Sequence, residues 1–406
     1  MITSWANADA SALQQSLRMS NQAFAEYLGV AVRTVAYWRQ RPEKVPTLAK
    51  QAVLDRGLER APERAKAQFA QLVAKPEHGS TRGVEAVGIP GIGLLEQQAN
   101  SEPEPEDAEY LESVRSHIGE IVALDNRFGG ADLVKLSARF FRTIHKQLGS
   151  RSFAPRMERD LHSAAGELAE VVGWLAYDAE EHDLARMMNQ EALYYTRLAG
   201  DKSIELLTLQ NSSMHAAAQG RPVEALHIAR SVLEGSYSLS PRLRALFLTR
   251  KARALAQAGD EGSLRVFPQI RSLFLDGVSD DDPAWTWWVD EHELAWHEAM
   301  ALRDLGRASE ARALFEQSMA GTPATEIRGQ YIHGAYLLQV QVDNASWADA
   351  EREIRRLLPL SAEVASTRAV VLLRGILRRI AARDNVPATL QEQAALLGDA
   401  LDKAPV

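Results

Sequence analysis

The sequence predicts an all-α fold with a small N-terminal helical domain followed by a long array of paired helices. Apolar residues recur at spacings of three and four along most of the 406 residues, the period of a helix with one buried face. From position 110 onward, turn residues interrupt this pattern every 15 to 20 residues. The alternation of apolar and polar residues that is typical of strands does not stand out anywhere.

The composition excludes several classes of protein. The chain contains no cysteine, which rules out disulfides, thiolate metal sites and cysteine nucleophiles. It has no run of 18 apolar residues that could cross a membrane, and residues 1–12 lack the basic and apolar segments of a signal peptide. We therefore expect a cytoplasmic protein that does not contact membranes.

Charge is distributed unevenly and divides the chain into three parts. Residues 1–75 hold eleven basic and six acidic side chains, a net charge of +5, whereas residues 76–109 hold one basic and eight acidic ones. The second stretch is rich in Gly, Pro, Ser and Glu and has no helical period, as expected for a flexible acidic linker. The sequence predicts a DNA-binding domain over 1–75, this linker over 76–109 and helical repeats over 110–406.

The basic N-terminal part has the layout of two helices joined by a tight turn. Phe24 and Leu28 lie four residues apart on one predicted helical face, and Gly29 follows as a residue suited to end that helix. In the next predicted helix, Val35 and Trp38 are spaced to point inward. This is the arrangement of a helix-turn-helix motif.

The opposite face of the second predicted helix would then face a DNA duplex. Arg33 can bond a guanine through two donors, and Val32 or Ala36 can contact a thymine methyl group. Gln22 and the arginines that follow the helix would bind phosphates. The predicted DNA-binding residues are Gln22, Val32, Arg33, Thr34, Ala36, Tyr37, Arg39 and Arg41.

The stretch SNQAFAEYLGVAVRTVAYW resembles the phage-repressor-type (Xre-like) helix-turn-helix. Ala31 stands where that family usually has a Ser or Thr cap, and Arg39 where an acidic residue commonly follows the Trp. The resemblance implies sequence-specific binding to double-stranded DNA by a homodimer; the alternative is a three-helix packing module that binds no DNA. The matching residues are Ser20, Gln22, Phe24, Ala25, Leu28, Gly29, Val30, Val35 and Trp38.

Residues 48–72 continue as an amphipathic segment that Pro62 interrupts. Val53, Leu54 and Leu58 form one apolar stripe before the proline, and Phe69 follows it. The segment either completes the core of the small domain or forms a dimer contact.

A degenerate repeat runs through the C-terminal part. A short turn is followed after five residues by a small or apolar anchor residue, and these anchors fall at 185, 225, 264, 311 and 350. The spacing and pattern resemble the tetratricopeptide repeat, stretched beyond its usual length. The resemblance implies a superhelix whose concave face is formed by the first helix of each pair.

Projecting this register places a set of aromatic, amide, arginine and methionine side chains on the concave face. Such a lining suits a peptide, small-molecule or protein effector, although apolar residues at this spacing are equally typical of an ordinary core. The predicted ligand-binding residues are Trp174, Tyr177, Gln210, Met214, Arg253, Trp296, Met300 and Gln339.

The segment DDDPAWTWWVDEHELAWHE, residues 280–298, holds four of the eight tryptophans. It is either an apolar anchor between repeats or a ligand or docking site, and its three aspartates are more typical of a helix cap than of a cation site. His292 and His297 are five residues apart, which does not match the zincin spacing of four. With no GxSxG motif or phosphate loop, we expect no catalytic residues, metal or cofactor.

Together, the two resemblances are typical of bacterial helix-turn-helix regulators with repeat-built sensor domains. They imply a transcription factor whose repeats mediate dimerisation and bind an effector. The alternative is a scaffold protein whose repeats recruit protein partners and whose N-terminal domain binds DNA weakly or not at all.

Overall fold

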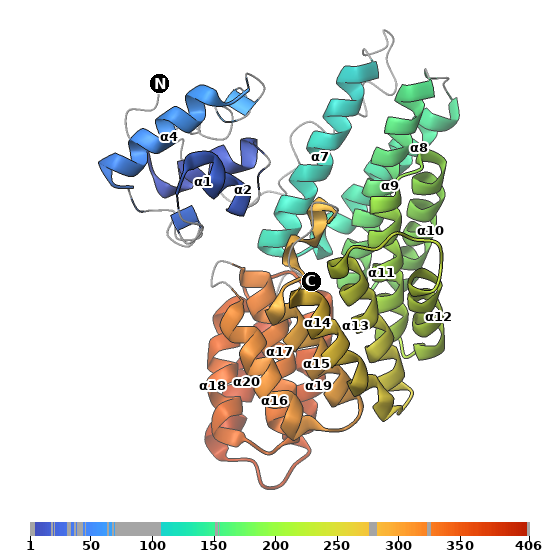
Figure 1. Ribbon diagram of the computed structural model, residues 1–406. Helices are drawn as coiled ribbons and strands as arrows, with labels where there is room; N and C mark the ends of the chain where they lie inside the picture. Colours follow the sequence, from blue (N-terminus) through green and yellow to red (C-terminus); the bar gives the residue numbers. More distant parts are fainter. Residues whose placement is uncertain are drawn as a thin grey trace. The chain divides into compact units, whose positions relative to one another are not determined.

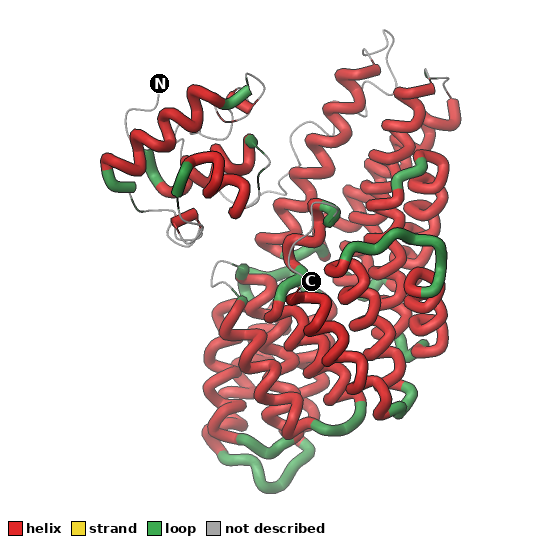
Figure 2. Tube along the Cα trace, viewed as in Figure 1, coloured by secondary structure: helices red, strands yellow, loops and turns green. Residues whose placement is uncertain are grey.

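The computed structural model describes residues 5–17, 19, 21–30, 34–35, 38, 44, 46–62, 65–66, 69, 107–150, 153, 155–275, 282–322 and 326–403. These residues form helices joined by loops and turns, and no strand occurs among them (Figure 2). The all-α prediction is therefore confirmed for this part of the chain. The chain divides into two compact units, Met1–Val87 and Gly88–Val406. Of the predicted linker, only residues 107–109 are described, and they already belong to a helix.

The N-terminal unit contains helices α1 (Asn7–Ser16), α2 (Asn21–Leu28) and α4 (Leu48–Arg60). Residues 34, 35 and 38 are helical as well. Gly29 ends α2 with φ at +69°, a left-handed conformation that favours glycine, and the N–H of Val30 bonds the carbonyl of Ala25 at 2.9 Å. The predicted turn after Leu28 is present.

The core of this unit contains the inward-facing residues that the sequence indicated. Phe24, Leu28, Val35 and Trp38 are all buried in one apolar cluster. Residues from both flanks complete it, since Trp5 stacks on Phe69 with 5.4 Å between ring centroids. The segment after residue 48 therefore contributes to the core of its own unit, also through Leu54.

The C-terminal unit is built from helices that follow one another in antiparallel pairs (Figure 1). Short helices η1 (Ala131–Leu133), η2 (Glu261–Arg265) and η3 (Ala284–Trp288) lie between some of them. The first helices of the pairs are α7 (Asp107–Phe128), α9 (Pro155–Asp178), α11 (Lys202–Ala218), α13 (Pro241–Gln257), α15 (Glu291–Asp304), α17 (Ile327–Asp343) and α19 (Thr367–Ala381). The second helices are α8 (Val134–Ser150), α10 (His182–Ala199), α12 (Pro222–Leu233), α14 (Val266–Leu275), α16 (Ala308–Gly321), α18 (Trp347–Leu360) and α20 (Ala388–Lys403). The helices of each pair pack against each other except in the first pair, where α7 and α8 both pack mainly against α9.

The turn inside each of five pairs has the same geometry. In each turn, one residue adopts a positive φ, and the N–H of the next residue bonds the carbonyl five positions earlier at 2.8 to 3.0 Å, as in a Schellman motif. Each left-handed residue lies five positions before a predicted anchor: these residues are Glu180, Gly220, Gly259, Gly306 and Ala345.

The anchor residues themselves lie where the two helices of a pair pack together. Ala185, Ala225, Ala311 and Ala350 have no exposed surface, whereas Leu264, which lies in η2, is partly buried. Gly173 lies close to the second helix of its pair, since a Cβ atom there would lie 2.7 Å from Oδ1 of Asn189. Small residues thus set the close approach within the pairs.

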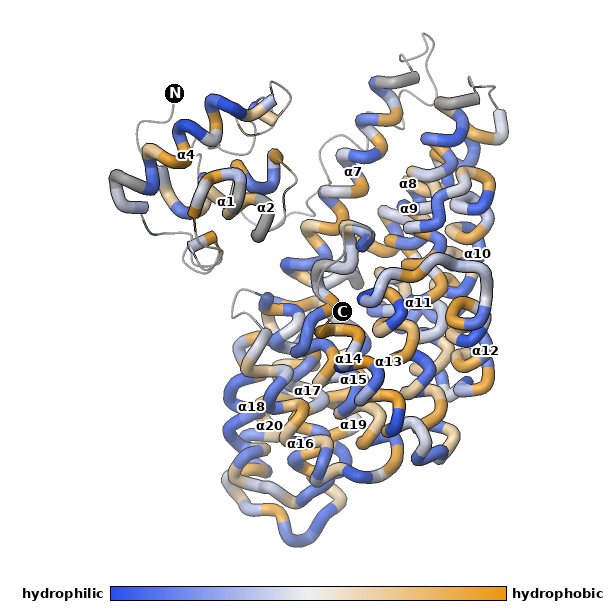
Figure 3. Tube along the Cα trace, viewed as in Figure 1, coloured by the Kyte–Doolittle hydropathy of each residue, from blue (hydrophilic) through white to orange (hydrophobic). Residues whose placement is uncertain are grey.

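The helices of this unit are amphipathic, and hydrophobic and hydrophilic residues alternate along their traces (Figure 3). Their buried faces form several adjoining apolar clusters rather than one central core. Across the described ranges, no helix has both the length and the hydrophobicity that a lipid bilayer would require.

The last pairs contact the first ones. Helix α17 packs against α7, and α19 packs against α9. The N–H of Ala365 donates to the carbonyl of Phe128 at 2.7 Å, which joins the segment before α19 to the end of α7. The first helices of the pairs therefore surround a common interior.

Candidate functional site

An interior cavity of about 750 Å³ lies in the C-terminal unit. Residues from all seven first helices, together with η3, line it, and the second helices contribute none of the lining residues. A volume of this size, with mixed apolar and polar walls, is typical of a small-molecule site. The first helix of each pair thus faces the interior, as the repeat pattern indicated.

Seven of the eight predicted ligand-binding residues line this cavity. Gln339 does not; its side chain is partly buried and accepts a hydrogen bond from Nη1 of Arg303 at 3.3 Å. Most of the seven are buried, because the last helix pairs contact the first ones and the array closes on itself. They are Trp174, Tyr177, Gln210, Met214, Arg253, Trp296 and Met300.

Trp296 shows that a residue here can belong to both the core and the cavity wall. It is 7% exposed and stacks on His333 with 4.1 Å between ring centroids. It also meets Phe315 and Tyr336 edge to face. Trp296 is therefore a core residue that also forms part of the cavity wall, and its role as a ligand contact stays a prediction.

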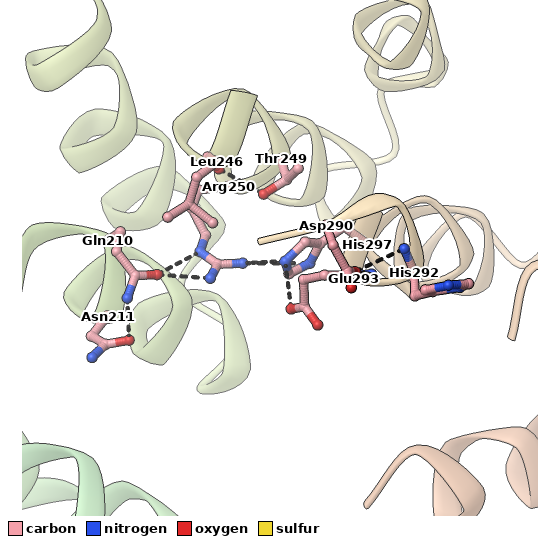
Figure 4. A network of polar contacts seen from close by, with 9 residues as sticks. All are labelled: Gln210, Asn211, Leu246, Thr249, Arg250, Asp290, His292, Glu293 and His297. Atoms are coloured by element: carbon pink, nitrogen blue, oxygen red, sulfur yellow. Dashed lines mark hydrogen bonds and ion pairs between the residues drawn. The ribbon is translucent and has the colours of Figure 1, made fainter. Parts of the chain in front are cut away.

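A chain of polar side chains runs from α9 to α15 along the cavity, and Figure 4 shows its part from Asn211 to Glu293. Asn211 donates to Glu170 at 2.5 Å, and Gln210 donates to Asn211 at 2.6 Å. Two nitrogens of Arg250 donate to Oε1 of Gln210, at 2.7 and 3.2 Å. This links α9, α11 and α13 through buried polar groups, and buried networks of this kind hold their members in one geometry.

The network continues from Arg250 to α15. Nε2 of His297 lies 2.9 Å from Nη1 of Arg250 and 3.1 Å from Oε1 of Glu293. Burial, with Arg250 adding to it, lowers the pKa of His297 to about 4, so the ring is neutral at pH 7. A neutral ring nitrogen either accepts from Arg250 or donates to Glu293, and the tautomer decides which.

A buried ion cluster joins the last helices to the first. Asp178, at the end of α9, has no exposed surface and lies 3.2 Å from Arg328 and 3.1 Å from Arg368. Burial alone would raise the pKa of Asp178, but the two arginines outweigh it and keep the pKa below its usual value. The same guanidinium groups stack on cavity aromatics, Arg328 on Trp174 and Arg368 on Tyr177.

The wall formed by α7 and α9 carries carboxyl groups with altered acidity. Burial raises the pKa of Asp125 and of Glu167. It raises the pKa of Glu170 to about 8, and the neighbouring carboxylates Glu167 and Asp125 add to the effect. Glu170 therefore keeps its proton at pH 7.

The sequence reasoning missed these charged residues, although part of the signal was present. Glu170 precedes Trp174 by four positions, Arg250 precedes Arg253 by three, and Glu293 precedes Trp296 by three. These spacings place each pair on one helical face, so extending the predicted register by one turn would have found them. Asp125 and Arg368 lie on helices outside the five anchored repeats, where the register gave no signal.

The tryptophan-rich segment packs against other helices and also forms part of the cavity wall. Trp285 and Trp288 on η3 line the cavity, and Trp285 donates to Oγ of Ser203 at 3.1 Å. Asp282 accepts from Ser240, the N-cap of α13, at 2.5 Å, which accounts for one of the three aspartates. Within the residues that the structure covers, no group of His, Asp or Glu could hold a metal ion.

Most of the predicted DNA-binding residues lie outside the described part of the chain. Thr34 is helical and partly buried. The backbone of Gln22 lies in α2, but its side chain is not described. The others outside the described residues are Val32, Arg33, Ala36, Tyr37, Arg39 and Arg41.

Comparison with known proteins adds no family. No protein-family model matches this chain, and no curated protein matches it.

Proposed function

We propose that this chain is a sequence-specific DNA-binding transcription regulator. In this proposal, a helix-turn-helix motif in the N-terminal unit binds double-stranded DNA as part of a homodimer. The tetratricopeptide-like C-terminal unit binds an effector in its cavity. The observation that carries the proposal is that seven of eight residues chosen as effector contacts from the repeat register line one cavity.

The N-terminal core supports the DNA-binding half of the proposal. Val35 and Trp38 are buried in one cluster with residues of α2, and we propose that the side of the second helix away from this cluster faces the duplex. In helix-turn-helix proteins, this side of the second helix enters the major groove. The net charge of +5 over residues 1–75 is the electrostatic footprint expected of such a domain.

The cavity supports the effector half. Its lining combines aromatic and aliphatic residues with a similar number of polar and charged ones, so it can contact both the apolar and the polar parts of a small ligand. Its walls come from seven different helices, so a bound molecule contacts most of the helix pairs at once. An effector that binds one arrangement of these helices more tightly than another shifts the balance between them.

DNA selection with the purified full-length chain tests the first half. We expect specific fragments to bind with dissociation constants of about 10⁻⁸ M or below at moderate salt, with a steep loss of affinity as salt rises. Arg33→Ala should relax the sequence preference, and Arg41→Ala should weaken binding to all sequences alike. Arg355→Ala replaces a half-exposed arginine on α18 and is the control. It should change neither the sequence preference nor the overall affinity for DNA.

Two results would contradict the regulator. One is equal affinity for selected and random fragments, which would favour the scaffold alternative. The other is unchanged DNA binding in both the Arg33 and Arg41 variants, which would show that the DNA-contacting residues are assigned to the wrong surface.

A further inference from the structure

The arginines that line the cavity have more partners within the protein than the carboxyl groups of α9 that line it. Four arginines line it, and each already has partners. Arg253 pairs with Asp304 at 3.4 Å, and Arg328 and Arg368 share Asp178. Arg250 directs its nitrogens to Gln210 and His297. Each of these arginines thus has a polar partner in the protein, although Nε and Nη2 of Arg328 form no hydrogen bond within the described residues.

The carboxyl groups on α9 are different. Glu170 is 5% exposed, and its one hydrogen bond within the described ranges comes from the neutral amide of Asn211. Glu167, one turn earlier on the same helix, forms no hydrogen bond or ion pair with any described residue, and Arg115 acts on it only at longer range. Residues three apart on a helix are neighbours, so these two carboxyl groups face the cavity side by side without a cation between them.

This arrangement is unfavourable for the empty protein. Burying a carboxylate without a partner has a large free-energy cost, which a protein avoids by keeping the group protonated. Glu170 follows that course, because burial raises its pKa to about 8. A positively charged group entering the cavity would remove the reason for this protonation.

Apolar and aromatic residues form another part of the cavity wall. Val122 on α7 and Leu207 on α11 line the same cavity. Trp285 is fixed at the first turn of α11 by its bond to Ser203, two turns before Asn211. Indole faces attract cations as well as apolar groups, so this wall suits a cation attached to a hydrophobic body.

We propose that the effector is a hydrophobic amine whose ammonium group binds between Glu167 and Glu170 while its apolar part packs on the tryptophan-lined wall. This proposal rests on the cavity being the effector site. As the ammonium group binds, Glu170 gives its proton to solvent and the carboxylate pairs with the cation. Asp125 on α7 and Asn211 on α11 are the other polar groups that face Glu170.

Three small probes with one phenyl ring test the sign of the recognised charge: 2-phenylethylamine, 2-phenylethanol and 3-phenylpropionate. Each is titrated into the full-length chain at pH 7 by calorimetry and by the change in tryptophan fluorescence. We expect the amine to bind at least about tenfold more tightly than the alcohol and the carboxylate, since only the amine pairs with buried carboxylates. Calorimetry in buffers of different ionisation enthalpy should also show release of close to one proton per amine bound.

Two variants test whether Glu170 and Glu167 cause the preference for the amine and the release of the proton. Glu170→Gln resembles the protonated acid and can still accept from Asn211, so it should fold normally, lose most of the preference for the amine and abolish the proton release. Glu167→Gln should reduce the preference and keep the proton release. Glu158→Gln changes an exposed residue on the same helix that does not line the cavity, and it should bind all three probes as the unchanged protein does.

Three outcomes would overturn the inference. The first is binding of the alcohol or the carboxylate as tightly as the amine. That result would be compatible with an effector site in the cavity but would contradict the recognition of a positively charged group. The second is an amine preference that survives in both cavity variants. The third is the absence of binding by all three probes. None of these concerns DNA binding by the N-terminal unit, so the regulator proposal stands or falls on its own selection experiment.

Discussion

Asp178 and Arg368 are 190 residues apart in the sequence, yet Arg368 donates to a carboxylate oxygen of Asp178 inside the protein, at 3.2 Å from Nε. Ser366 bonds the same oxygen at 3.0 Å. Since Asp178 ends α9 and Arg368 begins α19, this contact holds together two helices that are remote in sequence. Removing it should affect the whole C-terminal unit and not only one helix pair.

Replacing Asp178 with Asn leaves Arg328 and Arg368 buried without their shared carboxylate. We expect the free energy of unfolding to fall by about 3 to 5 kcal/mol, the usual effect of removing one partner of a buried ion pair. Urea denaturation measures the change. Asp343→Asn removes the partner of Arg379 at a more exposed position and should change the stability by less than about 1 kcal/mol. Equal effects of the two substitutions would contradict a structural role for the buried cluster.

Glu170→Gln should make stability less dependent on pH. The pKa of Glu170 is raised from 4.5 to about 8 in the folded chain, so between these values the folded state holds a proton that the unfolded state releases. The contribution of Glu170 to stability therefore falls as pH rises from about 4.5 to 8. The variant lacks this loss of stability. Its free energy of unfolding should therefore exceed that of the unchanged protein by on the order of 3 kcal/mol at pH 8, with little difference at pH 4.5.

Denaturation series at several pH values test this expectation, with Glu158→Gln as the matched control. Asp125 and Glu167 also have altered pKa values. Because both proteins contain them, their contributions largely cancel when the free energies of unfolding of the two proteins are subtracted. A difference between Glu170→Gln and the unchanged protein that stays constant across the range would show that Glu170 ionises normally.

The ring of His297 should remain neutral well below pH 6. Burial and the charge of Arg250 lower its pKa from 6.5 to about 4, so the unfolded state takes up a proton first as pH falls. Its contribution to stability is present above about pH 6.5 and is lost as pH decreases toward 4. Nitrogen NMR of the imidazole measures the titration directly, and a midpoint near 6.5 would mean that the ring is exposed to solvent.

Ala345→Gly should stabilise the protein by about 1 kcal/mol, because an alanine with φ at +53° is in a conformation that costs roughly that much for any residue with a Cβ atom. Gly306 occupies the corresponding turn with φ at +76°, so Gly306→Ala should destabilise by a similar amount. Thermal and urea unfolding of both variants give the two values. If both changes destabilise the protein, the turns differ in some respect other than their backbone conformation.

The local structure of the C-terminal unit was predictable because it depends on short-range patterns. Gly220, Gly259 and Gly306 mark their turns in the sequence, and the anchors Ala225 and Ala311 follow at a fixed distance. Glu180 and Ala345 occupy equivalent turns without a glycine, and there the anchor spacing was the signal. The same register placed Trp174 and Trp296 on the cavity wall.

Other features could not be predicted because they depend on contacts between distant parts of the chain. The pairing of Asp178 with Arg328 and Arg368 has no local signature. For the same reason, the enclosure of the cavity and the altered acidity of Glu170 were not foreseen. Gln339 fits the register yet does not line the cavity, and its side chain instead bonds Arg303 on the neighbouring first helix α15.

The contact between the first and last helix pairs has a consequence for how this architecture can change. An open stack of helix pairs tolerates the gain or loss of a pair at either end, since each pair depends only on its neighbours. Here, such a change would separate Phe128 from Ala365 and leave Asp178 without its arginines. Duplication or deletion of a pair is thus disfavoured, and we expect variation in this protein to accumulate in side chains and loops while the number of pairs stays fixed.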